Sequence, residues 1–322
     1  MKVKRSSIFK LSCAITVFFY SVILAHYAIN GDQVHYIKIY NAIAGKSIID
    51  AYAYYILSID SAEFVHFFFT WIFSTVGLEK FWFVSVFNAI LAYISASLFV
   101  KLNASKAIGF VIITTSFYFN VLYFSAERLK FGFLLLFVAM LYVNRPRIFG
   151  LMLFASVLAH AQMVISFGSL VFNKVMGIVE RVIRSGYLSR SFLMLIIAGA
   201  LIALILGDHI AHKVIASAKS LKLGDLFKIS SVLLLAVFYA KDKKQACYVF
   251  VPIVFAVLIV GSDRVMMMGY FFFLYYGLKV NRGYNLGVIL TTIYFSYKSL
   301  NYLYLIVNYG DGFYKHGGFF GM

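Results

Sequence analysis

Ten long apolar runs take up most of this sequence. They cover residues 8–28, 81–100, 107–125, 129–143, 147–172, 191–207, 226–240, 246–261, 265–280 and 286–308. A helix that spans a bilayer needs about 20 mostly apolar residues, so ten spans with their connections use most of a 322-residue chain. The sequence therefore predicts an all-α, polytopic transmembrane helical bundle with about 10–11 spans, built as a single integral membrane domain over residues 1–322.

The composition excludes several other classes of protein. Apolar residues make up 63% of the chain and charged residues 13%, and the mean hydropathy is +0.90. An ordinary soluble domain is about 45–50% apolar and about 25% charged, so a soluble globular enzyme, a disordered chain and a disulfide scaffold are excluded. No Cys/His spacing typical of a metal site occurs, and neither a metal nor a cofactor is predicted.

The net charge of +17 indicates basic residues at the cytoplasmic ends of helices, and not nucleic-acid binding. An anionic lipid or lipid-linked substrate would favour the same excess of basic residues. A basic N-terminus precedes the first run, which is too long for a signal peptide and is expected to be a retained helix. The N-terminus is then cytoplasmic, and the segments 29–63 and 208–225 are expected to be periplasmic loops.

Two apolar segments do not fit simple crossings. The run from Phe64 to Gly77 has 14 residues, or about 21 Å of helix, against a hydrocarbon core of roughly 30 Å. The run 147–172 would place the basic residues of 173–190 outside if it crossed once. We expect 64–77 to be re-entrant or interfacial, and 147–172 to be broken near His160 into two short limbs of about 12 residues.

Polar residues after the first run form the first candidate site. In a helix, Asp32, Tyr36 and Tyr40 are spaced i, i+4, i+8 and share one face. A carboxylate beside phenols can bind sugar hydroxyls or take a proton from one. The alternative is an interfacial helix with tyrosines at headgroup depth and Asp32 as its N-cap.

A charged segment, Glu127-Arg128-Leu129-Lys130, separates two apolar runs. These charges should lie at the outer rim or line a wet cavity, and the helix must break near them. Arg128 at a helix N-terminus is unfavourable for stability but suits a bound phosphate, with Lys130 nearby. The alternative is a rim arginine paired with Glu127.

His160 and Arg264 complete the candidate residues. His160 interrupts an apolar run beside Gln162 and can act as a base near pH 7, or it can be a structural hydrogen-bonded histidine. Arg264 begins an apolar helix as Arg128 does, so the two arginines together suit a diphosphate. Asp263 is the partner of Arg264 in the structural alternative.

The order of these features resembles the EpsG/Wzy-like family of bacterial polysaccharide polymerases. The matching features are Gly31-Asp32…Tyr36…Tyr40, a short apolar segment after Glu63, Glu127-Arg128-Leu129 in place of an Ile-Arg-Gln-like signature, Leu158-Ala159-His160 in place of Phe-His, and a late arginine, Arg264. The resemblance extends over about residues 25–270.

The resemblance implies polymerisation of undecaprenyl-diphosphate-linked oligosaccharide repeats into O-antigen or a related surface polysaccharide, at the periplasmic face of a bacterial inner membrane. The enzyme would be a metal-independent glycosyltransferase, with a chain-length regulator protein as a further partner. Arg128 and Arg264 would bind the diphosphate, and His160 or Asp32 would be the base. We favour His160 as base and Asp32 as the group that orients the acceptor.

Two other functions fit the same residues. A transporter or flippase for a lipid-linked or anionic substrate would use the arginines for binding alone, although the repeated halves usual in carriers are not visible. A membrane-embedded acyltransferase would use His160, although such enzymes usually keep further polar residues within their helices.

Overall fold

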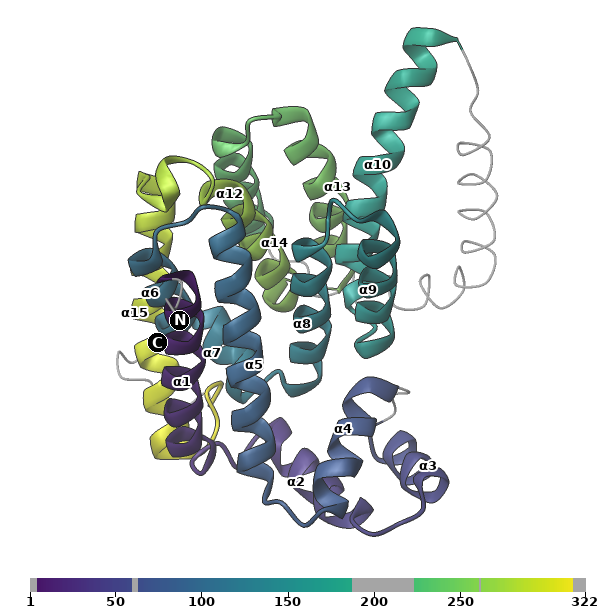
Figure 1. The fold of residues 1–322 in the computed structure, drawn as a ribbon, viewed down its shortest axis with the longest axis vertical. Helices are drawn as coiled ribbons and strands as arrows, with labels where there is room; N and C mark the ends of the chain where they lie inside the picture. Colours follow the sequence, from purple (N-terminus) through teal and green to yellow (C-terminus); the bar gives the residue numbers. More distant parts are fainter. Residues whose placement is uncertain (1–4, 60–62, 187–222, 261, 315–322) are drawn as a thin grey trace. The chain divides into compact units, whose positions relative to one another are not determined.

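The protein is all-helical in the computed structural model, which describes residues 5–59, 63–186, 223–260 and 262–314 (Figure 1). No β-strand occurs among these residues. The helices are α1 (Arg5–Ala25), α2 (Asp32–Ile43), α3 (Ile48–Ile59), α4 (Phe64–Thr75), α5 (Lys80–Lys101), α6 (Lys106–Thr115), α7 (Phe117–Phe124), α8 (Glu127–Leu141), α9 (Pro146–Ala159), α10 (Met163–Ser185), α12 (Leu223–Tyr239), α13 (Lys243–Val260), α14 (Ser262–Gly277) and α15 (Leu286–Tyr309), with a 3-10 turn at Asn281–Gly283.

The helices form two compact units, residues 1–163 with 281–322, and residues 164–280. In the first unit, α1 packs along α5, and α8 packs against both α5 and α9. The helices α2, α3 and α4 lie together at one end of α5 (Figure 1). In the second unit, α12, α13 and α14 pack on one another. The single integral membrane domain expected from the sequence stays a prediction.

Several helices are long and apolar enough to cross a membrane. Among the described residues these are α1, α5 and α10, or four spans if α6 and α7 count as one, because these two pass the same test together across a 49° bend at Ser116. The coarse prediction of an all-α chain with apolar spans is therefore confirmed. Five further predicted apolar runs also form helices: 129–143, 226–240, 246–261, 265–280 and 286–308 coincide with α8, α12, α13, α14 and α15. The full count of membrane spans stays a prediction.

The short segment before α5 is helical over Phe64–Thr75. Twelve residues at 1.5 Å each make about 18 Å, so α4 alone does not cross a bilayer core. The segment 29–63, expected to be a loop, contains α2 and α3. The other expected loop, 208–225, and the run 191–207 lie outside the described residues, except that α12 begins at Leu223.

The predicted break near His160 is confirmed, because α9 ends at Ala159 and α10 begins at Met163. The expectation of two short limbs is wrong for the second limb, since α10 has 23 residues. Its basic residues Lys174, Arg181 and Arg184 alternate at helical spacing with apolar residues, so the helix continues past 172 as an amphipathic segment.

Candidate functional site

A buried carboxylate, Glu63, joins the ends of three helices of the first unit. Its Oε1 accepts a hydrogen bond from Nδ1 of His160, and its Oε2 accepts one from Nη1 of Arg128 at 3.0 Å. Nε of Arg128 also donates to the hydroxyl of Tyr36 at 3.0 Å. We call Tyr36, Glu63, Arg128 and His160 the Glu63 cluster.

Each member of the Glu63 cluster comes from a different element. Tyr36 lies on α2, Glu63 directly precedes α4, Arg128 lies in the first turn of α8, and His160 follows the last residue of α9. His160 has an extended backbone, with φ −158° and ψ 124°, and this turns its side chain out of the helical path. Helix termini thus bring the charged groups together where the chain is free to change direction.

Gly132 on α8 makes room for the break at His160. A Cβ atom at position 132 would lie 2.5 Å from Cγ of Met163 and 3.4 Å from Cβ of His160. The first distance is below normal van der Waals contact, so a side chain here would push the break away from α8. The missing side chain therefore lets α8, which carries Arg128, approach the segment that carries His160.

Arg128 keeps hydrogen-bonding capacity beyond these two contacts. A guanidinium has five N–H donors, and the described residues accept from only its Nε and Nη1. Its side chain is 19% exposed, compared with 6% for Glu63 and 7% for His160. The outer edge of the guanidinium can therefore take a further acceptor, such as a phosphate oxygen, without losing Glu63.

The charges around Glu63 keep it ionised. Burial raises the pKa of the Glu63 carboxyl, but the hydrogen bond from His160 and the nearby positive charge of Arg128 outweigh burial, so the net pKa lies below its ordinary value. An ionised carboxylate on Nδ1 fixes the proton of a neutral imidazole there and leaves Nε2 with its lone pair. Nε2 lies 3.4 Å from Oε1 of Gln162, and since both atoms are acceptors in this tautomer, Nε2 is free unless the amide turns its NH₂ group toward it.

A second carboxylate, Glu127, forms a neighbouring group that we call the Glu127 cluster. It accepts a hydrogen bond from Nζ of Lys80 at 2.8 Å and lies 3.3 Å from Nε2 of His66. The other nitrogen of His66 lies 2.8 Å from the hydroxyl of Tyr55, and Lys80 also donates to Gln33. Glu127 and His66 are almost fully buried.

Tyr36 lies between the two clusters. Arg128 Cζ lies 5.9 Å from the centroid of its ring and Lys80 Nζ lies 5.7 Å from it. The ring of His66 is 5.7 Å away, centroid to centroid. Both cations can interact with the electron-rich ring face, which favours a fixed position for the guanidinium.

Over the described part of the chain, no three His, Cys, Asp or Glu side chains are grouped to hold a metal ion.

Three of the seven residues singled out from the sequence meet in this site, namely Arg128, His160 and Tyr36. Arg128 does lie at a helix N-terminus, because α8 begins at Glu127. The structural alternative, an Arg128–Glu127 pair, is wrong: Arg128 pairs with Glu63, and Glu127 pairs with Lys80. The first turn of a helix sends neighbouring residues in different directions, so adjacent charges find separate partners.

Tyr40 and Lys130 have buried contacts elsewhere. The hydroxyl of Tyr40 donates to the carbonyl of Leu78 at 2.8 Å, and its ring packs in a core cluster with Phe83. Lys130 is buried, and its Nζ donates to the carbonyl of Tyr123 at 3.3 Å. Their side chains hold helices together in this structure, and their predicted substrate contacts are not seen in the Glu63 cluster.

Asp32 and Arg264 lie outside the cluster. Asp32 is the exposed first residue of α2; the N-cap is Gly31, so the alternative of Asp32 as N-cap is off by one residue. Asp32 shares the helix with Tyr36 as expected, but Tyr36 is buried. Arg264 is an exposed residue in the first turn of α14, in the second unit. A joint contact of Arg128 and Arg264 with one diphosphate stays a prediction.

The sequence analysis did not identify Glu63, His66, Lys80 and Gln33 as site residues. The signal for Glu63 was its position directly before an apolar helix, and its contact with Arg128 exists only in three dimensions. His66 lies inside an apolar segment, where a titratable group needs a buried partner.

No family model, no curated protein and no solved structure matches the chain.

Proposed function

We propose that this protein is a membrane-embedded, metal-independent glycosyltransferase that polymerises undecaprenyl-diphosphate-linked oligosaccharide repeats. The observation that carries the proposal is the Glu63 cluster, in which one carboxylate binds an imidazole and a guanidinium at the same time. An imidazole held by a carboxylate is the arrangement of a general base, and an arginine at a helix N-terminus is that of an oxyanion or phosphate site.

The reaction needs a base and a stabilised leaving group. A hydroxyl oxygen of one repeat attacks the anomeric carbon of the other, and its proton passes to Nε2 of His160. The bond between the anomeric carbon and the diphosphate oxygen breaks, and undecaprenyl diphosphate leaves with the electron pair. Glu63 stabilises the imidazolium that forms, as the acid does in a catalytic triad.

Arg128 supports the departure of the diphosphate. Its free N–H groups and the first-turn amides of α8 donate to phosphate oxygens as negative charge develops there. A preorganised donor of this kind typically lowers the activation barrier by about 3–4 kcal/mol. The donor carries its own activation in the diphosphate, so no nucleotide is needed. Tyr36 holds Nε of Arg128, so the guanidinium plane is fixed before substrate binds.

The proposed setting is the periplasmic face of a bacterial inner membrane. We propose about 10–11 spans, a cytoplasmic N-terminus, and the α2–α4 region with the Glu63 cluster on the periplasmic side. The basic N-terminal residues support a cytoplasmic N-terminus, and the three to four apolar helices support a membrane setting. A chain-length regulator protein is the expected partner.

The test is incubation of the purified protein in liposomes with a lipid-linked repeat unit. A ladder of products spaced by one repeat, formed also with a chelator present, supports the proposal. Movement of the intact lipid-linked repeat between leaflets without a ladder would support the transporter or flippase alternative. Transfer of an acyl group in place of a sugar would support the acyltransferase.

A further inference from the structure

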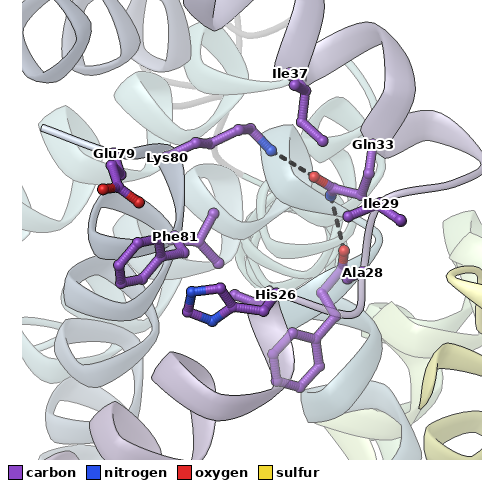
Figure 2. Close-up of a pocket in the computed structure, with 11 residues that line it drawn as sticks. His26, Ala28, Ile29, Gln33, Ile37, Glu79, Lys80 and Phe81 are labelled. Carbon is purple, nitrogen blue, oxygen red and sulfur yellow. Dashed lines mark hydrogen bonds between the residues drawn. The ribbon is translucent and has the colours of Figure 1, made fainter. Parts of the chain in front are cut away.

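A cavity of about 240 Å³ lies in the first unit, next to the Glu127 cluster. It is formed where the end of α1, the start of α2, the N-terminus of α5 and the end of α7 meet. Figure 2 shows the rings of His26 and Phe81 on one side and the paired side chains of Lys80 and Gln33 on another. Pockets for drug-sized ligands measure about 300–1,000 Å³, so this one suits a smaller molecule.

The polar groups of the cavity still have unused hydrogen-bonding capacity. Nδ1 of His26 bonds to the carbonyl of Val22 at 2.7 Å, which leaves Nε2 for a ligand. The Glu79 carboxylate has no hydrogen-bond partner among the described residues. Lys80 uses two of its three N–H donors, on Gln33 and Glu127. The cavity thus offers acceptors and at least one donor.

The charges favour a neutral ligand. An anion would meet the free Glu79 carboxylate, and the Lys80 ammonium is already paired with Glu127 at 2.8 Å. A cation would meet the same ammonium. A neutral polyol can donate to Glu79 and His26 and accept from Lys80, while a C–H face packs against the edge of the Phe81 and His26 rings, whose centroids lie 4.2 Å apart. A single sugar ring has all of these features.

The cavity is also linked to the Glu63 cluster. Gln33, in the cavity wall, donates to the carbonyl of Phe124 at 2.7 Å and accepts from Lys80, and both bonds are drawn in Figure 2. Lys80 and Arg128 lie near the same Tyr36 ring. Lys80 therefore connects the cavity wall, through Gln33, to the Tyr36 ring that Arg128 also contacts.

We propose that this cavity is a binding subsite for one neutral sugar residue of the oligosaccharide substrate. The inference deepens the proposed function and rests on it for the substrate class. Glu79 and His26 accept hydrogen bonds from sugar hydroxyls, Lys80 donates one, and the sugar ring packs against Phe81. The subsite positions the saccharide, and the chemistry takes place at the Glu63 cluster.

The test is direct binding of free sugars to the full-length protein in nanodiscs, by saturation-transfer difference NMR. The probes are methyl glycosides of neutral hexoses and of N-acetylhexosamines. We expect saturable binding in the millimolar range, weakened at least about tenfold by Phe81→Ala and by Glu79→Ala. Glu79 makes no side-chain cap contact with α5, so Glu79→Ala should fold normally. The matched control is Ile90→Ala, an exposed residue of α5 outside the cavity.

Several results would overturn the subsite. These are no binding of any glycoside, equal binding by all variants, or saturable binding of phosphocholine or inorganic phosphate in its place. The ladder assay separates this failure from that of the proposed function. Ladders without glycoside binding would contradict the subsite alone, whereas glycoside binding sensitive to Phe81→Ala without ladders would contradict the polymerase and leave a sugar-binding site.

Discussion

Glu63 and His160 are 97 positions apart in the sequence, and the carboxylate of one accepts a hydrogen bond from Nδ1 of the other. The same carboxylate is bonded to Arg128 at 3.0 Å. One acidic residue therefore orients both groups that the proposed chemistry needs, the base and the diphosphate-binding guanidinium. This gives Glu63 a positioning role in the mechanism and a stabilising role in the fold.

Replacing Glu63 should change stability in a pH-dependent way. At pH 7, Glu63→Gln should lower the free energy of unfolding by about 3 kcal/mol, because it removes the charged partner of the partly buried Arg128 and of the buried His160. The folded pKa of Glu63 is below its unfolded value of about 4.3, so the contribution is complete above that value and is lost as pH falls through the folded pKa. Thermal unfolding in detergent at neutral and acid pH measures the difference, which should shrink in acid.

The matched control for this experiment is Glu79→Gln, because Glu79 is exposed and its carboxylate has no partner in the described part of the chain. Its stability at pH 7 should lie within about 1 kcal/mol of the unchanged protein's, because among the described residues the exposed carboxylate has only the α5 N-terminus beside it. Equal stability of Glu63→Gln and Glu79→Gln at pH 7 would show that the Glu63 ion pairs contribute nothing to the fold.

Arg128→Lys should remove most polymerisation. The guanidinium binds Tyr36 through Nε and Glu63 through Nη1 at the same time, and a lysine ammonium has no planar pair of donors for this geometry. We expect a rate loss of about 10²-fold or more, the size seen when a preorganised donor is removed. Arg147→Lys, at an exposed position, is the control and should retain the original rate. Full activity of Arg128→Lys would contradict the diphosphate-binding role.

The Glu127 cluster should be mainly structural. Glu127→Gln removes a buried charge that faces Lys80 and His66, and we expect a loss of about 3–5 kcal/mol. Asp225→Asn breaks only the Lys228 pair on the surface and should cost less than about 1 kcal/mol. Chemical denaturation followed by circular dichroism, which reports helix loss in both units, compares the two. A larger loss of unfolding free energy for Asp225→Asn than for Glu127→Gln would contradict the structural role of the Glu127 cluster.

The sequence predicts the main elements of the fold because apolar runs map directly onto helices. The run 81–100 becomes α5, and the run 286–308 becomes α15. The break at His160 was also predictable, since a polar pair inside an apolar run is costly unless the chain bends there. The length of α10 was not predicted, because an amphipathic helix continues beyond the purely apolar residues.

The site could be predicted only in part for a physical reason. Arg128 and His160 are conspicuous as isolated polar residues between apolar runs, and each lies at a helix end. Their shared partner, Glu63, lies in a polar stretch where one more acid is unremarkable. The pairing depends on how α4, α8 and α9 pack together, and helical periodicity contains no information on that packing.

Reporter fusions test the proposed orientation. A reporter inserted after Arg184 should be cytoplasmic, and one between α2 and α3 should be periplasmic, because basic residues remain on the cytoplasmic side. The Glu63 cluster then faces the periplasm with α2. A periplasmic reporter at Arg184 would contradict the orientation proposed for α9 and α10.

The most direct test of the central claim is polymerisation of a lipid-linked repeat by liposomes containing the original protein, His160→Gln or Asp32→Asn. Loss of the base at His160 should reduce the rate by about 10²–10⁴-fold while donor binding persists. Asp32→Asn should reduce it much less, because Asp32 is exposed and outside the Glu63 cluster. Full ladders from His160→Gln together with an inactive Asp32→Asn would contradict the account and make Asp32 the base.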